Sequence, residues 1–520
     1  MLMAIKRENL VGSTSGEEDL DAVIASQSPW TSTGKVPLAL TRDIERPLAQ
    51  VLWRRLLNDR PHRFEIILGP RRVGKTTCMY QTVQRIISEG ISPNRVWWLR
   101  LDHPLLAEQR LDILVQRVIA LSNASAKNPA YLFFDELAYA DRWDGWLKTF
   151  YDDRWPVKIV ATSSATAALR NRALESGIGR WEEQHLLPHS LYEFFTLARG
   201  MRSGTMFSAE ATLAATLRAA ASAEGALGSM VGLRRTLQLA GGFPELLSLA
   251  LAKETPSQRS LFDAAAENSD AEQEMLLESQ RILRSDAVER AIYKDIPQAF
   301  GVHNPRLLER VLYSLAGQMT AVLAPASLCQ QLGDMSQATF ERYTAYLERA
   351  FLIFTLANYA GSETSRQRRG RKLYFVDGAV RSAALQRGLG RHTDLLEMGL
   401  LIENMAASHL YALSQQSQIR LSYWRDRAGA KALEVDFIYE DPAAPLAFEV
   451  GSSAHHSRAG LHAFLRRHPE FAGKCYLISP DTLSLPPDRS SDGIGTLPLD
   501  AFLLAVGSQA QRELQRRLGV

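Results

Sequence analysis

The stretch that decides the fold is Phe64-Glu65-Ile66-Ile67-Leu68-Gly69-Pro70-Arg71-Arg72-Val73-Gly74-Lys75-Thr76-Thr77. It begins as an apolar strand, continues as Gly-x-x-x-x-Gly-Lys-Thr, and leads into an amphipathic helix predicted over Thr77 to Ile87. A loop of this spacing between a strand and a helix is typical of a phosphate-binding loop. Its backbone N–H groups surround the phosphates, and the helix N-terminus points its positive end at them. We therefore expect residues 69–77 to bind a nucleotide.

The side chains of the loop indicate the ligands. Lys75 is expected to neutralise the β- and γ-phosphates of ATP, and Thr76 to ligate Mg²⁺. About 60 residues further on, the run Leu132-Phe133-Phe134-Asp135-Glu136 reads as an apolar strand that ends in two carboxylates. Asp135 is expected to hold Mg²⁺ through water, and Glu136 to orient and polarise the attacking water. The sequence thus predicts hydrolysis of ATP to ADP and phosphate.

A third strand, Val157 to Thr162, leads into Ser163 and Ser164. Ser164 is a candidate for contacting the γ-phosphate or the attacking water. The alternative is an ordinary solvated serine in a loop.

Short apolar runs alternate with helical patterns from residue 64 to residue 187. The predicted strands are Phe64 to Leu68, Val96 to Leu101, Tyr131 to Phe134, Val157 to Thr162 and Gln184 to Leu187. Buried strands separated by helices indicate an α/β fold with a parallel sheet covered on both faces.

Composition limits the class of protein. A chain of 520 residues exceeds one ordinary core, so we expect about three or four domains. The net charge of +3, from 60 basic and 57 acidic residues, does not by itself indicate nucleic acid. The three cysteines lie far apart, which favours a reducing compartment without disulfides or structural zinc. No apolar run is long enough for a membrane span or a signal peptide, so a cytoplasmic location is expected.

Further motifs resemble a family of bacterial and archaeal AAA+-type ATPases that carry an uncharacterised C-terminal nuclease-like domain. The matching motifs are Thr162-Ser163-Ser164, Gly179-Arg180, Leu187-Pro188-His189-Ser190-Leu191-Tyr192-Glu193-Phe194 and Gly241-Gly242-Phe243-Pro244-Glu245. The resemblance implies a ring of subunits, expected to be a hexamer. It makes Arg180 the candidate arginine finger that reaches a neighbouring subunit's ATP. The alternative for Arg180 is a surface arginine.

Five segments are expected from these patterns. They are a flexible N-terminal arm over 1–40, a P-loop AAA+ core over 41–204, a helical lid over 205–290, a winged helix over 291–385 and a nuclease-like α/β domain over 386–520.

The segment from Pro325 to Val376 resembles a winged helix-turn-helix. Its helices are expected over Ala326 to Leu332 and Ser336 to Ala350, followed by a basic hairpin. Between Gly361 and Arg391 stand eight basic and two acidic residues, which favours contact with a phosphate backbone. The candidate DNA-binding residues are Arg366, Arg368, Arg369, Arg371 and Lys372. The alternative is a solvated basic loop in a domain that only packs on its neighbours.

The C-terminal part resembles the restriction-endonuclease-like fold, in which carboxylates gather a metal ion and a lysine supports the nucleophile. Glu403, Asp436 and Glu449 match the carboxylates, whereas Gly451 stands where the lysine is expected. Lys431 and Lys474 are the open alternatives for that cation. We therefore expect a degenerate site that does not cut DNA.

Together these features predict an ATPase that acts on DNA, as a motor or remodeller at branched or broken structures. The rival is a nucleotide-gated switch whose C-terminal half binds a protein partner in defence or signalling. A third reading, an ATP-controlled endonuclease, depends on the lysine.

Overall fold

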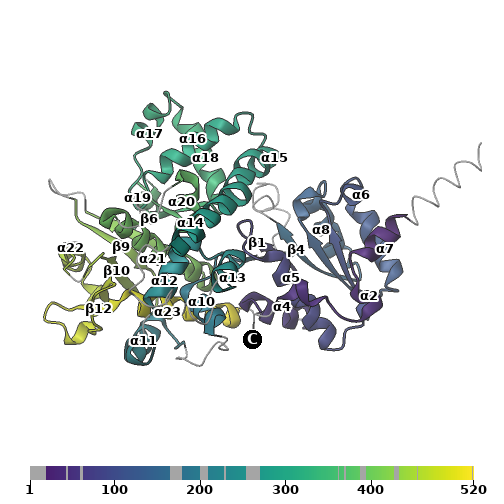
Figure 1. The fold of residues 1–520 in the computed structure, drawn as a ribbon, viewed down its shortest axis with the longest axis horizontal. Coiled ribbons are helices and arrows are strands. Elements are labelled where there is room, and N and C mark those ends of the chain that lie inside the picture. Colours follow the sequence, from purple (N-terminus) through teal and green to yellow (C-terminus); the bar gives the residue numbers. More distant parts are fainter. Residues whose placement is uncertain are drawn as a thin grey trace, which may run out of the picture. The chain divides into compact units, whose positions relative to one another are not determined.

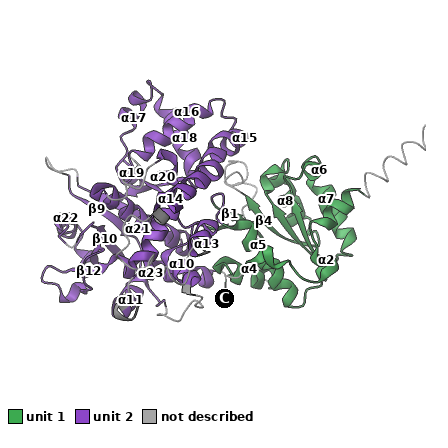
Figure 2. Ribbon diagram, in the orientation of Figure 1, with its two compact units in different colours: residues 1–69, 74–186, 518–520 green, residues 70–73, 187–517 purple. Residues whose placement is uncertain are grey.

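The computed structural model of the chain divides into two compact units. Unit 1 comprises residues 1–69, 74–186 and 518–520, and unit 2 comprises residues 70–73 and 187–517 (Figure 2). The structure describes residues 19–42, 45–58, 63–163, 179–199, 209–227, 230–252, 270–360, 362–367, 370–386, 394–426, 432–453, 455–517 and 519.

Unit 1 is built on a five-stranded sheet in the order β2-β3-β4-β1-β5. Two of its strands, β1 and β4, are labelled in Figure 1. Its strands are β1 (Phe64–Leu68), β2 (Val96–Arg100), β3 (Ala130–Asp135), β4 (Val157–Ser163) and β5 (Trp181–His185). Every neighbouring pair is parallel. All residues of β1 and β3 are buried, which requires cover on both faces of the sheet. The predicted α/β fold with a parallel P-loop sheet is confirmed.

Helices and short turns connect these strands. They are α2 (Trp30–Thr33), α3 (Leu38–Thr41), α4 (Pro47–Leu57), α5 (Lys75–Ser88), η1 (Pro93–Arg95), α6 (Pro104–Ala107), α7 (Leu111–Leu121), η2 (Leu137–Tyr139) and α8 (Trp143–Asp152). Trp143, Leu147 and Phe150 of α8 are buried, so the helical spacing of these residues serves core packing.

The prediction of a flexible arm over residues 1–40 is wrong for residues 30–40. Trp30 is fully buried, donates from Nε1 to the backbone oxygen of Val96 at 2.8 Å, and lies edge-on to Tyr80. A buried indole that also satisfies its N–H is a firm anchor. This stretch therefore belongs to the core of unit 1.

Unit 2 begins with a helical region and continues into a second sheet. The helices up to residue 350 are α10 (Leu191–Arg199), α11 (Leu213–Leu227), α12 (Val231–Ala240), α13 (Pro244–Ala252), α14 (Asp270–Leu283), the π-helical turns η4 (Arg284–Glu289) and η5 (Ala291–Asp295), α15 (Ile296–Phe300), α16 (Pro305–Ala316), α17 (Pro325–Gln331) and α18 (Gln337–Arg349). Helix α18 begins after Ser336, whose hydroxyl accepts from the amide of Thr339, as an N-cap should.

The sheet of unit 2 has seven strands in the order β12-β11-β10-β9-β8-β6-β7. The strands are β6 (Ile353–Asn358), β7 (Lys372–Phe375), β8 (Leu421–Arg425), β9 (Glu434–Tyr439), β10 (Leu446–Val450), β11 (Cys475–Ser479) and β12 (Ile494–Pro498). The helices and turns among them are α19 (Glu363–Gln367), α20 (Gly378–Leu385), α21 (Leu395–Ser417), α22 (Ala459–Arg467), η7 (Pro469–Phe471), η8 (Pro487–Arg489) and α23 (Leu499–Arg517).

Both faces of this second sheet are covered, as successive residues of β10 show. Ala447 lies in an apolar cluster with Phe464 of α22, whereas Phe448 contacts Phe502 of α23 at 5.2 Å between ring centroids. Adjacent residues of a strand point to opposite faces. Hence α22 and α23 cover opposite faces.

The hairpin of β6 and β7 belongs to the same sheet as the C-terminal strands. Strand β6 pairs antiparallel with β7 and parallel with β8, through Ala357 with Ser422 and Asn358 with Tyr423. The predicted domain boundary between residues 385 and 386 is therefore wrong, because it would divide the strands of one sheet. The predicted boundary at 204/205 likewise differs from the change of unit after Leu186.

Among the described helices, none combines the length and apolar character that a membrane crossing requires.

Candidate nucleotide site and a buried lysine–carboxylate cluster

The phosphate loop follows β1 and ends where α5 begins. Gly74 has φ of +90°, a left-handed conformation that glycine adopts at little cost, and it is the N-cap of α5. Lys75 is buried, and its Nζ donates to the backbone oxygen of Gly69 at 2.9 Å. Thr76 and Thr77 stand in the first turn of α5, where amide groups and the helix dipole favour an anion.

Asp135 and Thr76 come together at the carboxyl end of the sheet. The hydroxyl of Thr76 lies 3.2 and 3.3 Å from the two carboxylate oxygens of Asp135. Asp135 also accepts from Thr162 Oγ1 at 2.5 Å. Burial raises the pKa of Asp135 to about 6, against the stabilising hydroxyl contacts. Hard oxygen ligands of this kind suit Mg²⁺, and a divalent cation beside the carboxylate would favour its ionised form.

Glu136 follows Asp135 in a strained conformation. Its φ of +58° lies in the left-handed region, which is costly for a residue with a Cβ. Its backbone N–H donates to Thr162 Oγ1 at 3.1 Å. Thr162 thus donates to one acidic residue and accepts from the backbone of the next, and so fixes both.

The middle of the phosphate loop, Pro70–Val73, groups with unit 2. Within that unit, Arg71 contacts Asp295 through two nitrogens at 2.7 and 2.6 Å. Arg72 contacts Glu245 at 2.9 Å and also Asp286. Val73 is fully buried. These guanidinium groups are engaged by carboxylates, so the loop offers a phosphate its backbone amides and Lys75.

Of the two remaining catalytic candidates, Ser164 lies outside the described residues. Arg180 precedes β5, and its guanidinium pairs with Asp152 at 2.8 and 3.0 Å. The backbone oxygen of Arg180 accepts from Phe64, the first residue of β1. Because β1 and β5 are parallel, Arg180 lies at the amino end of the strands, whereas the phosphate loop of the same subunit follows their carboxyl end. If Arg180 acts as an arginine finger, it must therefore act on the ATP of another subunit.

The basic hairpin is less available for DNA than its composition suggests. Arg366 is largely buried and pairs with Glu440 through two nitrogens at 2.6 and 2.8 Å. Lys372 is buried, with an exposed fraction of 1%. Arg371 is exposed, and Arg368 and Arg369 lie outside the described residues. The expectation that Lys372 contacts a phosphate backbone is wrong, because the side chain points into unit 2.

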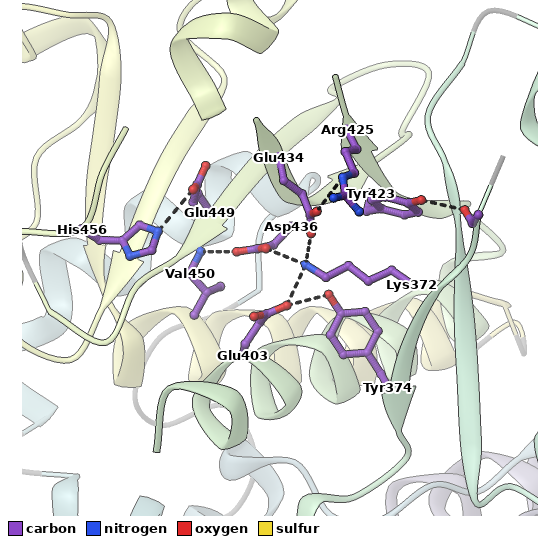
Figure 3. Close-up of polar contacts among 11 residues, drawn as sticks. Lys372, Tyr374, Glu403, Tyr423, Arg425, Glu434, Asp436, Glu449, Val450 and His456 are labelled. Carbon is purple, nitrogen blue, oxygen red and sulfur yellow. Dashed lines mark hydrogen bonds and ion pairs between the residues drawn. The ribbon is translucent and has the colours of Figure 1, made fainter. Parts of the chain in front are cut away.

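Lys372 instead lies among the carboxylates of the C-terminal sheet (Figure 3). Its Nζ is 2.8 Å from Glu403 of α21, 2.6 Å from Glu434 and 2.8 Å from Asp436, both of β9. These contacts define the lysine–carboxylate cluster: Lys372, Glu403, Glu434, Asp436 and, beside it, Glu449. Of the three predicted carboxylates, Glu403 and Asp436 thus meet at Lys372, and Glu449 lies on the neighbouring strand, opposite Asp436.

The register of the sheet explains why the acidic residues meet. Phe448 of β10 pairs with Phe437 of antiparallel β9, which places Glu449 opposite Asp436. Directly opposed like charges destabilise a sheet unless a cation intervenes. Asp436 also accepts from the amide of Val450 at 2.9 Å, and Glu449 contacts His456 Nε2 at 3.2 Å.

The pKa values reflect this crowding. Burial, followed by the charge of Asp436, raises the pKa of Glu403 to about 7, with Lys372 opposing the shift. Burial also raises the pKa of Glu449 to about 7, opposed by its hydrogen bond to His456. For Lys372, burial acts to lower the pKa, but Asp436 and Glu403 outweigh it and hold the pKa well above its usual value.

The cation that seemed missing from the sequence is therefore present, and it comes from another strand. Gly451 supplies none, Lys431 lies outside the described residues, and the lysine that contacts the carboxylates is Lys372. Within the described part of the chain, no group of three or more His, Cys, Asp or Glu side chains is arranged to hold a metal ion.

Sequence reasoning assigned Lys372 to DNA and missed it as the partner of the carboxylates. It also missed Glu434 and Thr162 as site residues. Lys372 opens the run Lys-Leu-Tyr-Phe, an otherwise apolar strand. A charge at the start of a buried strand was the available signal for an internal partner. Glu434 shares a strand face with Asp436 by its spacing of two. Thr162 lies on β4, next to the strand β3 that ends in Asp135. The two residues are neighbours only because of the order of the strands in the sheet.

Three family models match successive parts of the chain. Residues 61–195 match an AAA domain, residues 264–391 a domain of unknown function (DUF8612), and residues 398–499 another domain of unknown function (DUF4143). The chain therefore contains a P-loop domain of the AAA type, in the region that holds the phosphate loop.

Whole-chain relatives are distant. An uncharacterized protein of Methanocaldococcus jannaschii is 24% identical over 405 residues, which are 77% of this chain and 78% of that protein. Another from Haemophilus influenzae is 21% identical over 408 residues, 76% of this chain and 86% of that protein. Among solved structures, the Aeropyrum pernix ORC1 protein in complex with DNA covers 69% of this chain and 96% of its own, with 12% identity and a TM-score of 0.31.

Proposed function

We propose that this chain binds Mg·ATP at its phosphate loop and hydrolyses it to ADP and phosphate. One observation carries the proposal: the hydroxyl of Thr76 and the buried carboxylate of Asp135 meet within 3.2 Å beside Lys75 and Glu136. That is a metal ligand pair next to a phosphate-binding lysine and a candidate base, on an AAA-type domain.

Each residue has one task in the proposed reaction. Lys75 and the amides of the α5 N-terminus bind the β- and γ-phosphates, and Thr76 and Asp135 hold Mg²⁺, which neutralises phosphate charge when bound. Glu136 accepts a hydrogen bond from the attacking water and polarises it. Thr162 keeps Glu136 in place through the backbone contact at 3.1 Å.

Two substitutions test this division of labour. Lys75→Ala should abolish nucleotide binding, because the phosphates lose their charge partner. Glu136→Gln should bind ATP as the parent does, but its turnover rate should fall by about a hundredfold or more, as expected for loss of a general base. Nucleotide affinity and steady-state phosphate release are the measurements. A Glu136→Gln protein that hydrolyses ATP at the parental rate would refute the assignment of the base.

We further propose that ATP turnover serves work on DNA, by a ring of subunits that is a hexamer. Supporting this are helices α17 and α18, joined by a short turn and followed by the β6–β7 hairpin, with Arg371 exposed beside β7. The buried Lys372 and the paired Arg366 reduce the basic surface that was expected. The rival remains a nucleotide-gated switch that binds a protein partner.

DNA stimulation of the ATPase separates these two functions. A DNA-directed motor should turn over ATP faster with single-stranded, duplex or four-way-junction DNA, and the stimulation should fall with added salt. Arg371→Ala should weaken it, whereas Arg366→Ala should act mainly on the stability of unit 2. An ATPase rate that ignores every form of DNA favours the protein-gated switch.

The proposal does not include cleavage of DNA. The reason given by the sequence, the lack of a cation beside the carboxylates, is wrong, since Lys372 supplies one. The structure offers a different reason: the carboxylates that would gather a metal are already bound to Lys372.

A further inference from the structure

The ammonium of Lys372 lies at the point where the carboxylates of α21 and β9 converge (Figure 3). Its three shortest ion pairs, of 2.6 to 2.8 Å, run to three different acidic side chains. We propose that Lys372 is a built-in cation that occupies a latent divalent-metal site, so that this site is complete without a metal and opens to one only when the lysine is removed.

The number of carboxylates around the ammonium matches the number of its N–H donors. A lysine has three N–H donors, and three carboxylates stand within ion-pair distance of it. Lys372 has an exposed fraction of 1%, and a buried ammonium is costly unless it is paired and hydrogen-bonded. Likewise the carboxylates, with Asp436 and Glu449 on opposed strands, need a positive charge to coexist. Lysine and carboxylates therefore depend on one another.

Lys372 is also held in place by its strand. Asn404 of α21 accepts from the amide of Phe375 at 2.8 Å and donates to the oxygen of the same residue at 3.1 Å. Tyr374 donates to Glu403 at 2.9 Å. Strand β7 is thus fixed both to α21 and to the cluster, so the backbone of Lys372 stays beside the carboxylates.

A divalent ion and the ammonium would compete for the same oxygens. Mg²⁺ binds oxygen at about 2.1 Å in near-octahedral geometry, so it would need the oxygen atoms of Glu403 and Asp436 that now face Lys372. One further oxygen, Glu449 Oε2, is buried with no hydrogen-bond partner among the described contacts. Without Lys372, the carboxylates of Glu403, Glu434 and Asp436 would present the oxygen atoms that a hard cation prefers.

The test counts bound Mn²⁺ in the full chain. All variants carry Lys75→Ala, so that no metal enters with nucleotide at the phosphate loop. The parent should bind no Mn²⁺ that depends on Asp436. Lys372→Met, which keeps the side-chain length and removes the charge, should bind one additional Mn²⁺ per chain, and Lys372→Met/Asp436→Asn should lose it. Lys474→Met, the same change at a lysine that makes none of these ion pairs, is the matched control and should bind Mn²⁺ as the parent does. Electron paramagnetic resonance of free Mn²⁺ gives the count.

Thermal unfolding provides the second readout. In EDTA, Lys372→Met should melt below the parent, and either Mn²⁺ or the added Asp436→Asn should restore part of the loss. If Lys372→Met does not fold in EDTA, refolding with Mn²⁺ should recover it. Asp436-dependent Mn²⁺ binding by the parent would overturn the proposal, because lysine and metal would then coexist. A Lys372→Met protein that neither binds nor responds to Mn²⁺ would overturn it as well.

Discussion

His409 shows how one buried side chain makes the stability of unit 2 depend on pH. Its Nε2 accepts from the amide of Leu191 at 2.8 Å, and its Nδ1 lies 2.8 Å from the oxygen of Met405. An acceptor nitrogen carries no proton, so the ring is neutral with its proton on Nδ1. Burial lowers the pKa of His409 to about 4, against the smaller opposing effects of Met405 and Glu193.

The sign of the effect follows from this lowered pKa. Between pH 6.5 and 4 the unfolded chain binds a proton at His409 and the folded chain does not, so acid favours unfolding. The contribution amounts to about 2 kcal/mol between pH 7 and pH 5. In urea unfolding, His409→Gln should lose stability at pH 7 yet show a smaller further loss at pH 5 than the parent. His303→Gln, at an exposed position, is the control. Equal pH slopes for His409→Gln and the parent would contradict this account.

At the residue scale, the sequence predicted the chemistry of local motifs and missed partners that the chain brings from afar. Lys75, Thr76 and Asp135 lie as their motifs require, because a strand, a loop and a helix fix them locally. Lys372 stands 31 residues before Glu403 and 64 before Asp436, and no local spacing joins them. The pairing of β7 with β6 and of β6 with β8 brings the lysine into that sheet.

Helix α22 illustrates how closely elements approach one another beside the cluster. A Cβ on Gly460, near the start of this helix, would lie 1.9 Å from the backbone oxygen of Glu434 and 2.7 Å from Glu449 Oε2. Backbone cannot yield as a flexible side chain can, so any larger residue must push α22 away from β9.

Gly460→Ala should therefore destabilise unit 2 by about 1–3 kcal/mol or more, the usual range for overpacking. Gly145→Ala in α8 is the matched control, because its Cβ would meet nothing within 4 Å. That change should be neutral or stabilise unit 1 by about 0.5–1 kcal/mol, as alanine replaces glycine in a helix. Chemical denaturation of both variants gives the comparison. Similar effects of the two substitutions would mean that the close approach at Gly460 relaxes freely.

At the element scale, apolar runs bounded by turn residues located most strands. Strand β1 has the predicted bounds, and the predicted start of β4 is correct. Strand β5 begins three residues earlier than predicted, at Trp181, because Trp-Glu-Glu-Gln-His carries charges that an apolar pattern does not include. Its two glutamates are only partly buried, as an edge strand permits.

At the scale of the whole molecule, Arg180 carries the proposal of a ring. It lies at the amino end of the strands, away from the phosphate loop of its own subunit, and pairs with Asp152. If it completes a neighbour's site, Arg180→Ala should bind ATP normally and hydrolyse it poorly. Mixing Arg180→Ala with Glu136→Gln should restore some activity, because some interfaces then combine an intact base with an intact arginine.

The matched control is Asp152→Ala, which removes the carboxylate that pairs with Arg180 but keeps the arginine, and it should retain turnover. Steady-state ATPase rates across mixing ratios are the measurement, alongside the mass of the assembly in solution. A mixture no more active than the average of its two parents would count against a shared site.

Domain boundaries were the part of the whole molecule that the sequence predicted least well. Changes of composition placed one boundary at 204/205 and another at 385/386, but contacts divide the chain after Leu186 and keep β6 to β12 together. Composition reports local preference, whereas a domain is defined by which strands pair across long separations. A helical stretch followed by a basic loop therefore looked like a separate module.

The pairing of β6 with β8 limits how the gene for this protein can be rearranged during evolution. The two segments of unknown function, residues 264–391 and 398–499, contribute neighbouring strands to one sheet. A gene rearrangement that joined either segment to a new partner would leave a bare strand edge, and such edges invite aggregation. It would also separate Lys372 from the carboxylates that it neutralises. Selection should therefore transmit the two segments as a single cassette, and lineages that lost one should have lost the other or replaced the missing strands.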